Sequence, residues 1–437
     1  MNDLPERFTY NDDQLSAIEL MIKFLSDPKE FFFLLEGYAG TGKSTCIQEV
    51  IARMPWVAAV FTAPTNKATR VLLDLSLKRG LETPCCTIYS LLGLRLKGTG
   101  EKQTIELEGE SKMPLYKLVV VDESSMANKE VFNHILEQAY NYSVKVIFMG
   151  DPAQLPPVGE KSSPVFTDIK NKAVLTKVER HDNQILTLAT RIRKEWSGDG
   201  DGSSMFATDH DEKGGVYCVD ARKFNLQIER AFTSDTYKDD PSLVRIIAWT
   251  NEAVRTYNDM VRRLLYGEDL QPFHIGERVV VCQPLIDVAA MKDTKMTEIT
   301  MTTDQEAVVL AVDVVPHLIY TRFKTLRLQL ETDDGEVNEA YVIHPDDEAN
   351  FQTNLSNMAD DARARKASWA SFWDMKQMFH DIRPCHAITA HRSQGSTYDS
   401  VLVDAANIQL NRNRREMLQC LYVAVSRASR VVVARTR

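Results

Sequence analysis

A glycine-rich segment near the start of the chain has the residue types and spacing that bind phosphate groups. It runs Gly37-Tyr-Ala-Gly-Thr-Gly42-Lys43-Ser44 and fits the pattern G-x-x-x-x-G-K-[ST]. The glycines let backbone N–H groups wrap around phosphate oxygens, the lysine reaches the β- and γ-phosphates, and the serine hydroxyl suits Mg²⁺. We predict a nucleotide site, with Ser44 as a metal ligand, formed by Gly37, Gly40, Thr41, Gly42, Lys43, Ser44 and Thr45.

Two acidic residues and a glutamine supply the remaining chemistry of hydrolysis. Asp122 and Glu123 directly follow an apolar run, and Gln154 lies in GDPAQLPPV after another such run. Phosphoryl hydrolysis needs a carboxylate near Mg²⁺ and a group that orients the attacking water. We assign Asp122 to the metal, Glu123 to the water and Gln154 to the γ-phosphate. The alternatives are an acidic helix N-terminus for the pair and a solvated proline-rich turn for Gln154.

Two other residues each have two interpretations. Gln14 either recognises adenine or forms a capping box with Asn11, and both can hold. Arg427 either complements a helix dipole or acts as an arginine finger that spreads transition-state charge. Arg180, in TKVERHDNQ, is a weaker candidate for the finger role.

Small polar side chains gather in several short segments that suit a phosphodiester backbone. They fall at predicted strand or helix ends, where hydroxyl, amide and backbone groups contact phosphates without reading sequence. Each segment alone is typical of an ordinary turn, and only their joint occurrence favours nucleic-acid binding. His391 has no acid or metal ligand nearby in the sequence, so by itself it does not indicate acid–base chemistry. The predicted contacts are Pro64, Thr65, Asn66, Lys67, Thr87, Tyr89, Thr250, Asn251, Thr389 and His391.

The elements that must position these residues alternate between helices and strands. Asn11 can cap a helix in which apolar residues recur at helical spacing, and residues 43–53 return to that pattern. Short apolar runs lie between these segments and after them, and each ends in a polar, turn-prone cluster. Buried parallel strands show this pattern, with functional loops at their carboxyl ends. The pattern up to about residue 160 therefore predicts an open, doubly wound α/β domain.

Two stretches interrupt this alternation. Residues 94–112 hold two alternating segments around Gly98 and Gly100, which predict a β-hairpin arm. Residues 197–215 are rich in glycine and aspartate, which predicts a mobile loop.

The second half of the chain has a different order of predicted strands and helices. A second α/β block starts near Val244 and resumes near Ile388. Between them, residues 276–345 hold several short strands without a helical pattern, which predict a small barrel. Residues 346–381 are polar and helical.

Composition limits the classes of protein that the chain can belong to. Lys and Arg total 52 and Asp and Glu total 61, so the formal net charge of −9 argues against bulk coating of nucleic acid. No apolar run approaches the roughly 20 residues of a membrane span, and MNDLPERFTYNDD lacks the apolar core of a signal peptide. The seven cysteines are odd in number and show no C-x-x-C spacing. We expect a reduced, cytoplasmic protein.

Taken in order, these segments resemble the signature motifs of the superfamily 1 helicases, and closely those of the 1B branch of RecD- and Dda-like enzymes. The resemblance runs from about Thr9 to Arg430. The Q motif is FTYNDDQ, motif I GYAGTGKST, motif Ia TAPTNKA, motif Ib TIYSLL, motif II VVDESSM, motif III GDPAQLPPV, motif IV VER, motif V ITAHRSQGSTYD and motif VI LYVAVSRAS.

The resemblance implies two RecA-like, doubly wound parallel-sheet domains, 1A and 2A, with ATP bound between them and single-stranded DNA across both. The hairpin arm would be the strand-separating pin of domain 1B, and the barrel an SH3-like domain 2B. The implied boundaries are residues 1–86 and 113–180 for 1A, 87–112 for 1B, 181–275 and 382–437 for 2A, and 276–381 for 2B with its helical extension.

The same resemblance implies the activity, cofactors and partners. It predicts a DNA helicase that moves 5′ to 3′, uses ATP and Mg²⁺, and binds single-stranded and forked duplex DNA as a monomer without a membrane. Gln394 and Gly395 of motif V would join the nucleotide site. A single-strand-binding protein or replisome components would be further partners, and host cytoplasm the location if a phage encodes the chain.

We weigh three alternatives at this point. The arm has no aromatic residue, so Ile105 or Leu107 must serve as an apolar wedge, and a single-strand translocase that displaces bound proteins is the alternative function. A GTP-dependent switch is a second alternative. It would use an N-K-x-D loop, and Asn66-Lys67 is instead followed by Ala68-Thr69. RNA also remains a possible substrate, since backbone contacts need not touch the 2′ position.

Overall fold

A computed structural model of the chain describes residues 9–97, 104–107, 109–157, 159–177, 184–200, 205–212, 214–294 and 299–436. These residues form two compact units. The first comprises Met1–Phe224, Ile247–Thr250 and Thr389–Arg437, and the second Asn225–Ile246 and Asn251–Ile388. The domain boundaries implied by the motifs stay a prediction.

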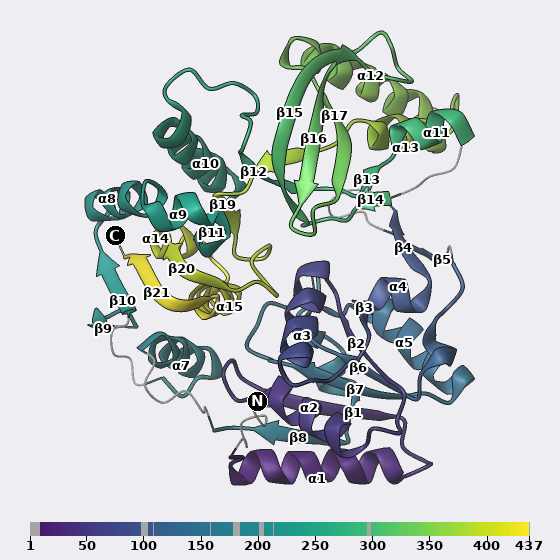
Figure 1. The fold of residues 1–437 in the computed structure, drawn as a ribbon, viewed down its shortest axis with the longest axis vertical. Coiled ribbons are helices and arrows are strands. Elements are labelled where there is room, and N and C mark those ends of the chain that lie inside the picture. The colour runs from purple at the N-terminus through teal and green to yellow at the C-terminus, as the bar shows by residue number, and fades with distance from the viewer. Residues whose placement is uncertain are drawn as a thin grey trace, which may run out of the picture. The chain divides into compact units, whose positions relative to one another are not determined.

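The first unit is built on a six-stranded sheet in which neighbouring strands are parallel (Figure 1). The strand order, β3-β2-β6-β7-β1-β8, places β7 on one side of β1 and β8 on the other, and helices cover both faces, as in a doubly wound sheet. The predicted α/β architecture is therefore confirmed. The strands are β1 (Phe32–Gly37), β2 (Ala59–Ala63), β3 (Cys85–Thr87), β6 (Leu118–Val121), β7 (Lys145–Gly150) and β8 (Lys172–Leu175).

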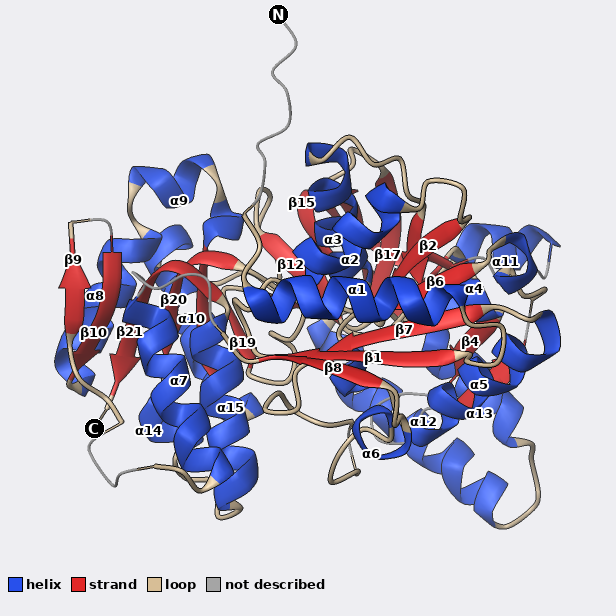
Figure 2. Ribbon diagram, turned by 90° about the horizontal axis from the view of Figure 1, so that it is seen from below, coloured by secondary structure: helices blue, strands red, loops and turns tan. Residues whose placement is uncertain are grey.

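The apolar strands form this sheet because their alternate residues fill two separate cores. In β1, Phe33 and Leu35 pack in one core and Leu34 in the other. The first core is closed by α1 (Asp12–Ser26), α2 (Lys43–Arg53) and α3 (Asn66–Lys78), and the second by α4 (Ile88–Leu92), α5 (Lys129–Tyr142) and α6 (Val165–Asp168). Figure 2 shows α1 running along the sheet beside β8 and β1. Single 3-10 turns occur at Met113–Leu115 and Ser124–Met126.

The predicted arm is present as an antiparallel hairpin of β4 (Leu94–Lys97) and β5 (Thr104–Leu107). Its base requires glycine, because a Cβ at Gly93 would lie 2.4 Å from the carbonyl oxygen of Gly109. The side chains of Ile105 and Leu107 and the tip of the hairpin lie outside the described residues. The pin therefore stays a prediction.

A second six-stranded sheet has the order β19-β11-β20-β21-β10-β9. Its strand β21 pairs in parallel with β20 and β10. The strands are β9 (Asp209–Asp211), β10 (Gly214–Val219), β11 (Val244–Ala248), β19 (Ala387–Thr389), β20 (Tyr398–Val403) and β21 (Ala428–Arg435). The helices are α7 (Gln184–Ser197), α8 (Ala221–Phe232), α9 (Asp235–Asp239), α10 (Asn251–Tyr266), α14 (Ala405–Ile408) and α15 (Arg414–Ser426), with a 3-10 turn at Pro241–Leu243.

The mobile loop predicted over residues 197–215 is wrong for its last part, which pairs as the antiparallel strands β9 and β10. The glycines there serve close packing. A Cβ on Gly214 would lie 2.2 Å from the carbonyl oxygen of Arg430, and one on Gly215 would lie 2.5 Å from that of Asp209. A glycine-rich composition therefore does not separate a flexible loop from a tightly packed strand.

The second unit contains the predicted strand-rich insertion, a five-stranded antiparallel sheet of order β17-β16-β15-β12-β18. A bulge between Val309 and Ala311 bends β15. The short helix α11 (Val288–Thr294) interrupts the strands and was not predicted, whereas the helical extension is present as α12 (Pro345–Arg363) and α13 (Trp369–Met378). The strands are β12 (Arg278–Val281), β13 (Leu285–Ile286), β14 (Ile299–Met301), β15 (Glu306–Pro316), β16 (Lys324–Thr332), β17 (Val337–Ile343) and β18 (Ile382–Pro384).

Among the described helices, none combines the length and the apolar character that crossing a bilayer requires.

His380, buried beside this sheet, makes the stability of the second unit depend on pH. Its Nδ1 accepts the backbone N–H of Tyr341 at 2.8 Å, and burial lowers its pKa from 6.5 to about 3. The unfolded chain therefore binds the proton first, so stability is complete above pH 6.5 and is lost as pH falls toward 3. We expect this one group to cost about 1.4 kcal/mol at pH 5.5.

Urea unfolding followed by circular dichroism at pH 7.5 and 5.5 measures this loss. His380→Asn keeps an acceptor for the Tyr341 N–H and does not titrate, so its loss between the two pH values should be smaller by about 1.4 kcal/mol. Burial also lowers the pKa of His317 and His386, so part of the acid sensitivity remains in the variant. Equal losses in both proteins would contradict the assignment.

Candidate active site

The glycine-rich loop connects β1 to α2 in the first unit, where the sequence predicted a phosphate cradle. Gly40 and Gly42 have φ values of +78° and +84°, which L side chains rarely adopt. A Cβ on Gly42 would also lie 2.5 Å from Nε2 of Gln14. Lys43 lies over the loop, with Nζ donating to the carbonyl oxygens of Gly37 at 2.6 Å and Tyr38 at 3.1 Å.

Gln14 connects α1 to the same loop. Its Oε1 accepts the N–H of Asn11, and its own N–H donates to the Asn11 side chain, so the predicted capping box is present. The amide Nε2 also donates to the carbonyl oxygen of Thr41 at 3.1 Å. Gln14 thus connects α1 to the phosphate loop through the Thr41 carbonyl. Its contact with adenine stays a prediction.

The acidic pair lies after β6, close enough to the loop for Lys43 to affect its charge. Burial and the neighbouring Glu123 carboxylate together raise the pKa of Asp122 to about 6, although the Lys43 ammonium acts in the opposite direction. Glu123 is left-handed, with φ of 49°, and its N–H donates to Oδ1 of Asp122 at 2.8 Å. The separate roles of the two carboxylates stay predictions.

Arg427 extends from the end of α15 to this acidic pair. Its Nη1 lies 3.8 Å from Oε1 of Glu123 and donates to the carbonyl oxygen of Ser396 at 3.3 Å. Arg427 is 6% exposed, and its buried Nε–H has no hydrogen-bond partner among the described residues. A buried cation with an unused donor is suited to an anionic ligand. Arg180 lies outside the described residues.

The loop after β7 is fixed by amides from several elements. Oε1 of Gln154 accepts the hydroxyl of Ser125 at 3.3 Å, and its carbonyl oxygen accepts Nε2 of Gln419 at 2.7 Å. Gln394 donates to the carbonyl oxygen of Leu155 at 3.0 Å. The structure therefore brings Gln154 and Gln394 to one loop, while their contacts with nucleotide stay predictions.

The threonine hydroxyls predicted to contact DNA have hydrogen-bond partners within the chain. The hydroxyls of Thr65 and Thr87 cap α3 and α4, Thr389 accepts the N–H of Arg392, and Thr250 accepts Nδ2 of Asn407. The ordinary structural interpretation thus holds for them, and DNA binding stays a prediction. Pro64 and Tyr89 are half-buried, Asn66 and Asn251 begin α3 and α10, and the Lys67 side chain lies outside the described residues.

Gly395 brings motif V beside motif Ia. It has φ of +70°, and a Cβ there would lie 3.4 Å from Oγ1 of Thr65 and 3.3 Å from Cβ of Ala68. This position was predicted to join the nucleotide site, and its described neighbours instead belong to the start of α3. The close approach favours glycine at this position.

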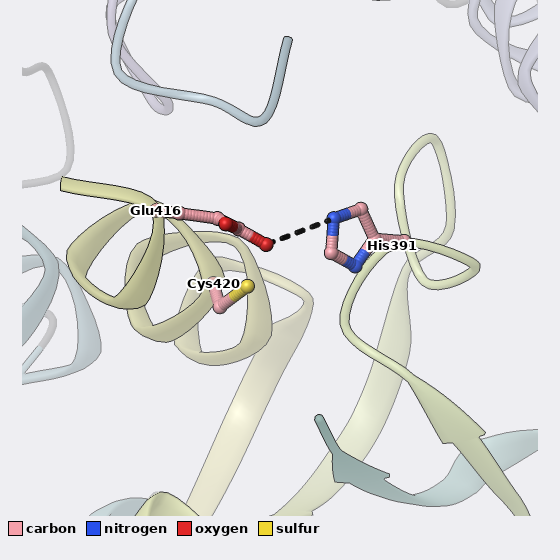
Figure 3. Close-up of side chains that lie close together, drawn as sticks. All are labelled: His391, Glu416 and Cys420. Atoms are coloured by element: carbon pink, nitrogen blue, oxygen red, sulfur yellow. Dashed lines mark ion pairs between the residues drawn. The ribbon is translucent and has the colours of Figure 1, made fainter. Parts of the chain in front are cut away.

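His391 has an acidic partner that the sequence did not indicate. Figure 3 shows its imidazole facing Glu416 and Cys420 of α15, with Nε2 at 3.9 Å from Oε1 of Glu416. One ligand atom from each residue lies within 4.8 Å of the others, close enough for a metal ion. Burial raises the pKa of the Cys420 thiol to about 12, which disfavours the thiolate that zinc binding needs. Burial also lowers the pKa of His391, which disfavours its charged form, so we treat the cluster as a histidine and a carboxylate beside a buried thiol.

Sequence reasoning missed two residues that contact the phosphate loop, Asp151 and Tyr422. Both side chains are buried and both hydrogen-bond to the backbone of Ala39. They lie inside the segments GDPAQLPPV and LYVAVSRAS, where the glutamine and the arginine drew the assignments. The sequence signal that could have indicated Tyr422 is its hydroxyl within the apolar part of a helix.

Together these elements define a P-loop nucleotide site in which an arginine associated with a second sheet faces the acidic pair of the first. Family models match three successive parts of the chain. They are an AAA domain over residues 9–216, a Dda helicase SH3 domain over 270–384 and a UvrD-like helicase C-terminal domain over 384–434. The three matches follow one another along the chain in an order that agrees with the resemblance to Dda-like helicases seen in its motifs.

Individual relatives match nearly the whole chain. The ATP-dependent DNA helicase dda of Enterobacteria phage T4 is 26% identical over 447 residues, which cover 95% of this chain and 97% of the phage protein. Uncharacterized protein R530 of Acanthamoeba polyphaga mimivirus is 23% identical, covering 96% and 98%.

Solved structures of Pif1 helicases share the fold. A structure of two coordinating Pif1 helicases at forked duplex DNA aligns with a TM-score of 0.52 and 16% identity, over 98% of this chain and 92% of that one. Pif1 from Bacteroides with ADP-AlF3 and single-stranded DNA aligns with a TM-score of 0.50 and 15% identity, over the same shares. The α/β fold with two RecA-like sheets and an SH3-like insertion agrees with these neighbours.

Proposed function

We propose that this chain is an ATP-dependent DNA helicase, powered by hydrolysis at the P-loop site. The observation that carries the proposal is the position of Arg427, whose Nη1 lies 3.8 Å from Oε1 of Glu123 and whose buried Nε–H has no partner among the described residues. A site that is complete only with an arginine from the second sheet can link hydrolysis to movement of that sheet. The name of the phage T4 relative, an ATP-dependent DNA helicase, supports the same activity.

In this proposal the residues of the site divide the work of hydrolysis. Ser44 and Asp122 supply the hard oxygen ligands that Mg²⁺ prefers, and the bound ion neutralises charge on the β- and γ-phosphates. Lys43 moves from the loop carbonyls to the phosphates. Glu123 orients the attacking water, and Arg427, helped by Arg180, stabilises the charge that develops in the transition state. Gln154 contacts the γ-phosphate through its side-chain amide.

For DNA, the proposed contacts are the backbone-binding groups of motifs Ia, Ib and V. The closeness of Gly395 to Thr65 supports a continuous track from motif Ia to motif V. His391 lines a cavity of about 470 Å³ whose wall holds Lys161 and Arg415 together with Glu160 and Glu416, so cations and carboxylates are both present near motif V. Hydroxyls and backbone groups along this track would bind phosphates without reading the bases.

For direction of movement, oligomeric state, partners, location and domain boundaries, the proposal follows what the resemblance to Dda-like helicases implies. The chain would move 5′ to 3′ on single-stranded DNA as a monomer and open forked duplexes with the 1B arm. Its partners would include a single-strand-binding protein or replisome components, and it would act in the cytoplasm. The implied 1A, 1B, 2A and 2B boundaries are part of the proposal.

A single-strand translocase that displaces proteins is the second candidate, and the absence of an aromatic residue from the arm sequence favours it. Release of streptavidin from an end-biotinylated oligonucleotide, measured beside unwinding of a tailed duplex, separates the two functions. A helicase performs both reactions. Streptavidin release with intact duplex would replace the helicase proposal with the translocase.

We expect single-stranded DNA to stimulate ATP hydrolysis at least about tenfold, because DNA bound across both sheets favours the arrangement in which Arg427 completes the site. Phosphate release, measured with and without an oligonucleotide, tests this expectation. A matched RNA oligonucleotide shows whether the 2′-hydroxyl is tolerated. ATP hydrolysis unaffected by either nucleic acid would contradict the proposed function.

A further inference from the structure

One backbone N–H of the phosphate loop is shared by two buried side chains from separate motifs. The N–H of Ala39 donates to Oδ2 of Asp151 and to the hydroxyl oxygen of Tyr422, each at 3.1 Å. The Tyr422 hydroxyl in turn donates to Oδ2 of Asp151 at 2.6 Å. Ala39 lies two residues after Gly37, in the middle of the loop that wraps the phosphates.

Burial makes this contact more than a surface hydrogen bond. Asp151 has no exposed surface and Tyr422 is 2% exposed. The other carboxylate oxygen of Asp151 accepts the N–H of Ala153 at 2.9 Å, so both of its oxygens are used. A hydroxyl that donates to a buried carboxylate is among the stronger neutral-donor hydrogen bonds.

The neighbouring loop residue is held from a second helix. The guanidinium of Arg193, on α7, stacks 3.7 Å from the ring centre of Tyr38. Helix α7 packs against α15, which carries Tyr422. Two consecutive residues of the phosphate loop are therefore held by two helices that pack on each other.

Helix α15 and Arg427, the residue at its C-terminal cap, contact three separate loops of the nucleotide site. Gln419 binds the carbonyl oxygen of Gln154, Tyr422 binds the phosphate loop and Asp151, and Arg427 faces Glu123. Because the helix is rigid, a shift of the phosphate loop transmitted at Tyr422 moves Arg427 as well.

We propose that Tyr422 and Asp151 are positioning residues that tie the phosphate loop to α15, so that the state of the loop sets the position of Arg427. This inference rests on the proposed function, because it concerns how DNA-stimulated hydrolysis is controlled. The hydroxyl of Tyr422 makes the hydrogen bonds that connect the helix to the phosphate loop and to Asp151. Asp151 and Ala39 keep each other as partners without it, so only the connection to the helix is lost.

Tyr422→Phe tests the proposal, because it removes the hydroxyl and keeps the ring that packs in the core. We expect DNA-stimulated kcat to fall about tenfold or more, the usual effect of losing a hydrogen bond to a charged group. The KM for ATP and the DNA-free rate should change less than about twofold. Steady-state hydrolysis with and without an oligonucleotide, and the melting temperature, are the measurements.

Tyr237→Phe is the matched control. Tyr237 is also buried, and its hydroxyl also has a buried partner, Nδ1 of His386 at 2.7 Å, in the second unit. Loss of that hydroxyl should leave the ratio of stimulated to DNA-free hydrolysis unchanged. An equal fall of this ratio in both variants would assign the effect to general destabilisation and overturn the proposal.

Asp151→Asn and the double variant test whether the two side chains act as one device. The double variant should be no worse than the more impaired single variant, whereas independent roles would multiply the losses. If the wild type shows no DNA stimulation, the proposed function itself fails. If the wild type is stimulated and Tyr422→Phe is stimulated equally, the positioning role alone is wrong.

Discussion

Lys43→Ala is expected to abolish productive ATP hydrolysis, with kcat about 100- to 1,000-fold lower in the presence of single-stranded DNA. The ammonium group has no described ion-pair partner in the ligand-free chain and rests on the carbonyl oxygens of Gly37 and Tyr38. It is therefore held in the loop that binds phosphates, ready to stabilise charge on them. Phosphate release under saturating ATP measures the loss.

Lys172→Ala provides the matched control for this prediction. Lys172 lies at the start of β8, next to β1, and pairs with Glu36 at 2.9 Å on a partly exposed surface. Lys172→Ala also removes one positive charge near the first sheet, but it leaves the phosphate loop unchanged. The rate of DNA-stimulated ATP hydrolysis should stay within about twofold of the wild-type rate. DNA-stimulated hydrolysis that survives in Lys43→Ala would refute the site.

The second large effect is expected at Arg427. Arg427→Ala should lower DNA-stimulated kcat about 1,000-fold while the KM for ATP changes only a few-fold, because an arginine finger acts mainly on the transition state. Its unused Nε–H and its approach to Glu123 are the structural reasons. Rapid-mix hydrolysis, together with fluorescent-nucleotide binding, separates the loss of kcat from a loss of binding.

Arg430→Ala is the control for Arg427, since Arg430 lies on β21 and forms an exposed pair with Asp399. It should retain activity. Because Arg427 is buried and also donates to Ser396, the melting temperature of Arg427→Ala must be measured. A folded Arg427→Ala protein with an unchanged kcat would contradict the finger role.

The first sheet and its phosphate loop could be predicted because their signals are local. In β1, the run FFLLEG places apolar residues toward both cores, and the glycines of the following loop adopt the left-handed values that the motif requires. Asn11 and Gln14 likewise form their capping box within one helical turn. Short-range patterns of this kind determine the local backbone structure, so they can be recognised without knowing the rest of the fold.

The contacts that connect the motifs could not be predicted, because they join residues far apart in the chain. Tyr422 meets Asp151, and Glu416 meets His391, only after the sheets and helices have packed. The loop predicted before β10 was wrong for a related reason. Gly214 and Gly215 look flexible in sequence, whereas the backbone of neighbouring strands leaves no room for a side chain there.

Strand separation on matched duplexes that carry either a 5′ or a 3′ single-stranded tail tests the central claim most directly. The account predicts that the chain opens the 5′-tailed duplex in the presence of ATP and Mg²⁺, and that Lys43→Ala does not. Opening of the 3′-tailed duplex alone would contradict the assignment to the 1B branch. Two intact duplexes, despite DNA-stimulated ATP hydrolysis, would contradict the helicase function.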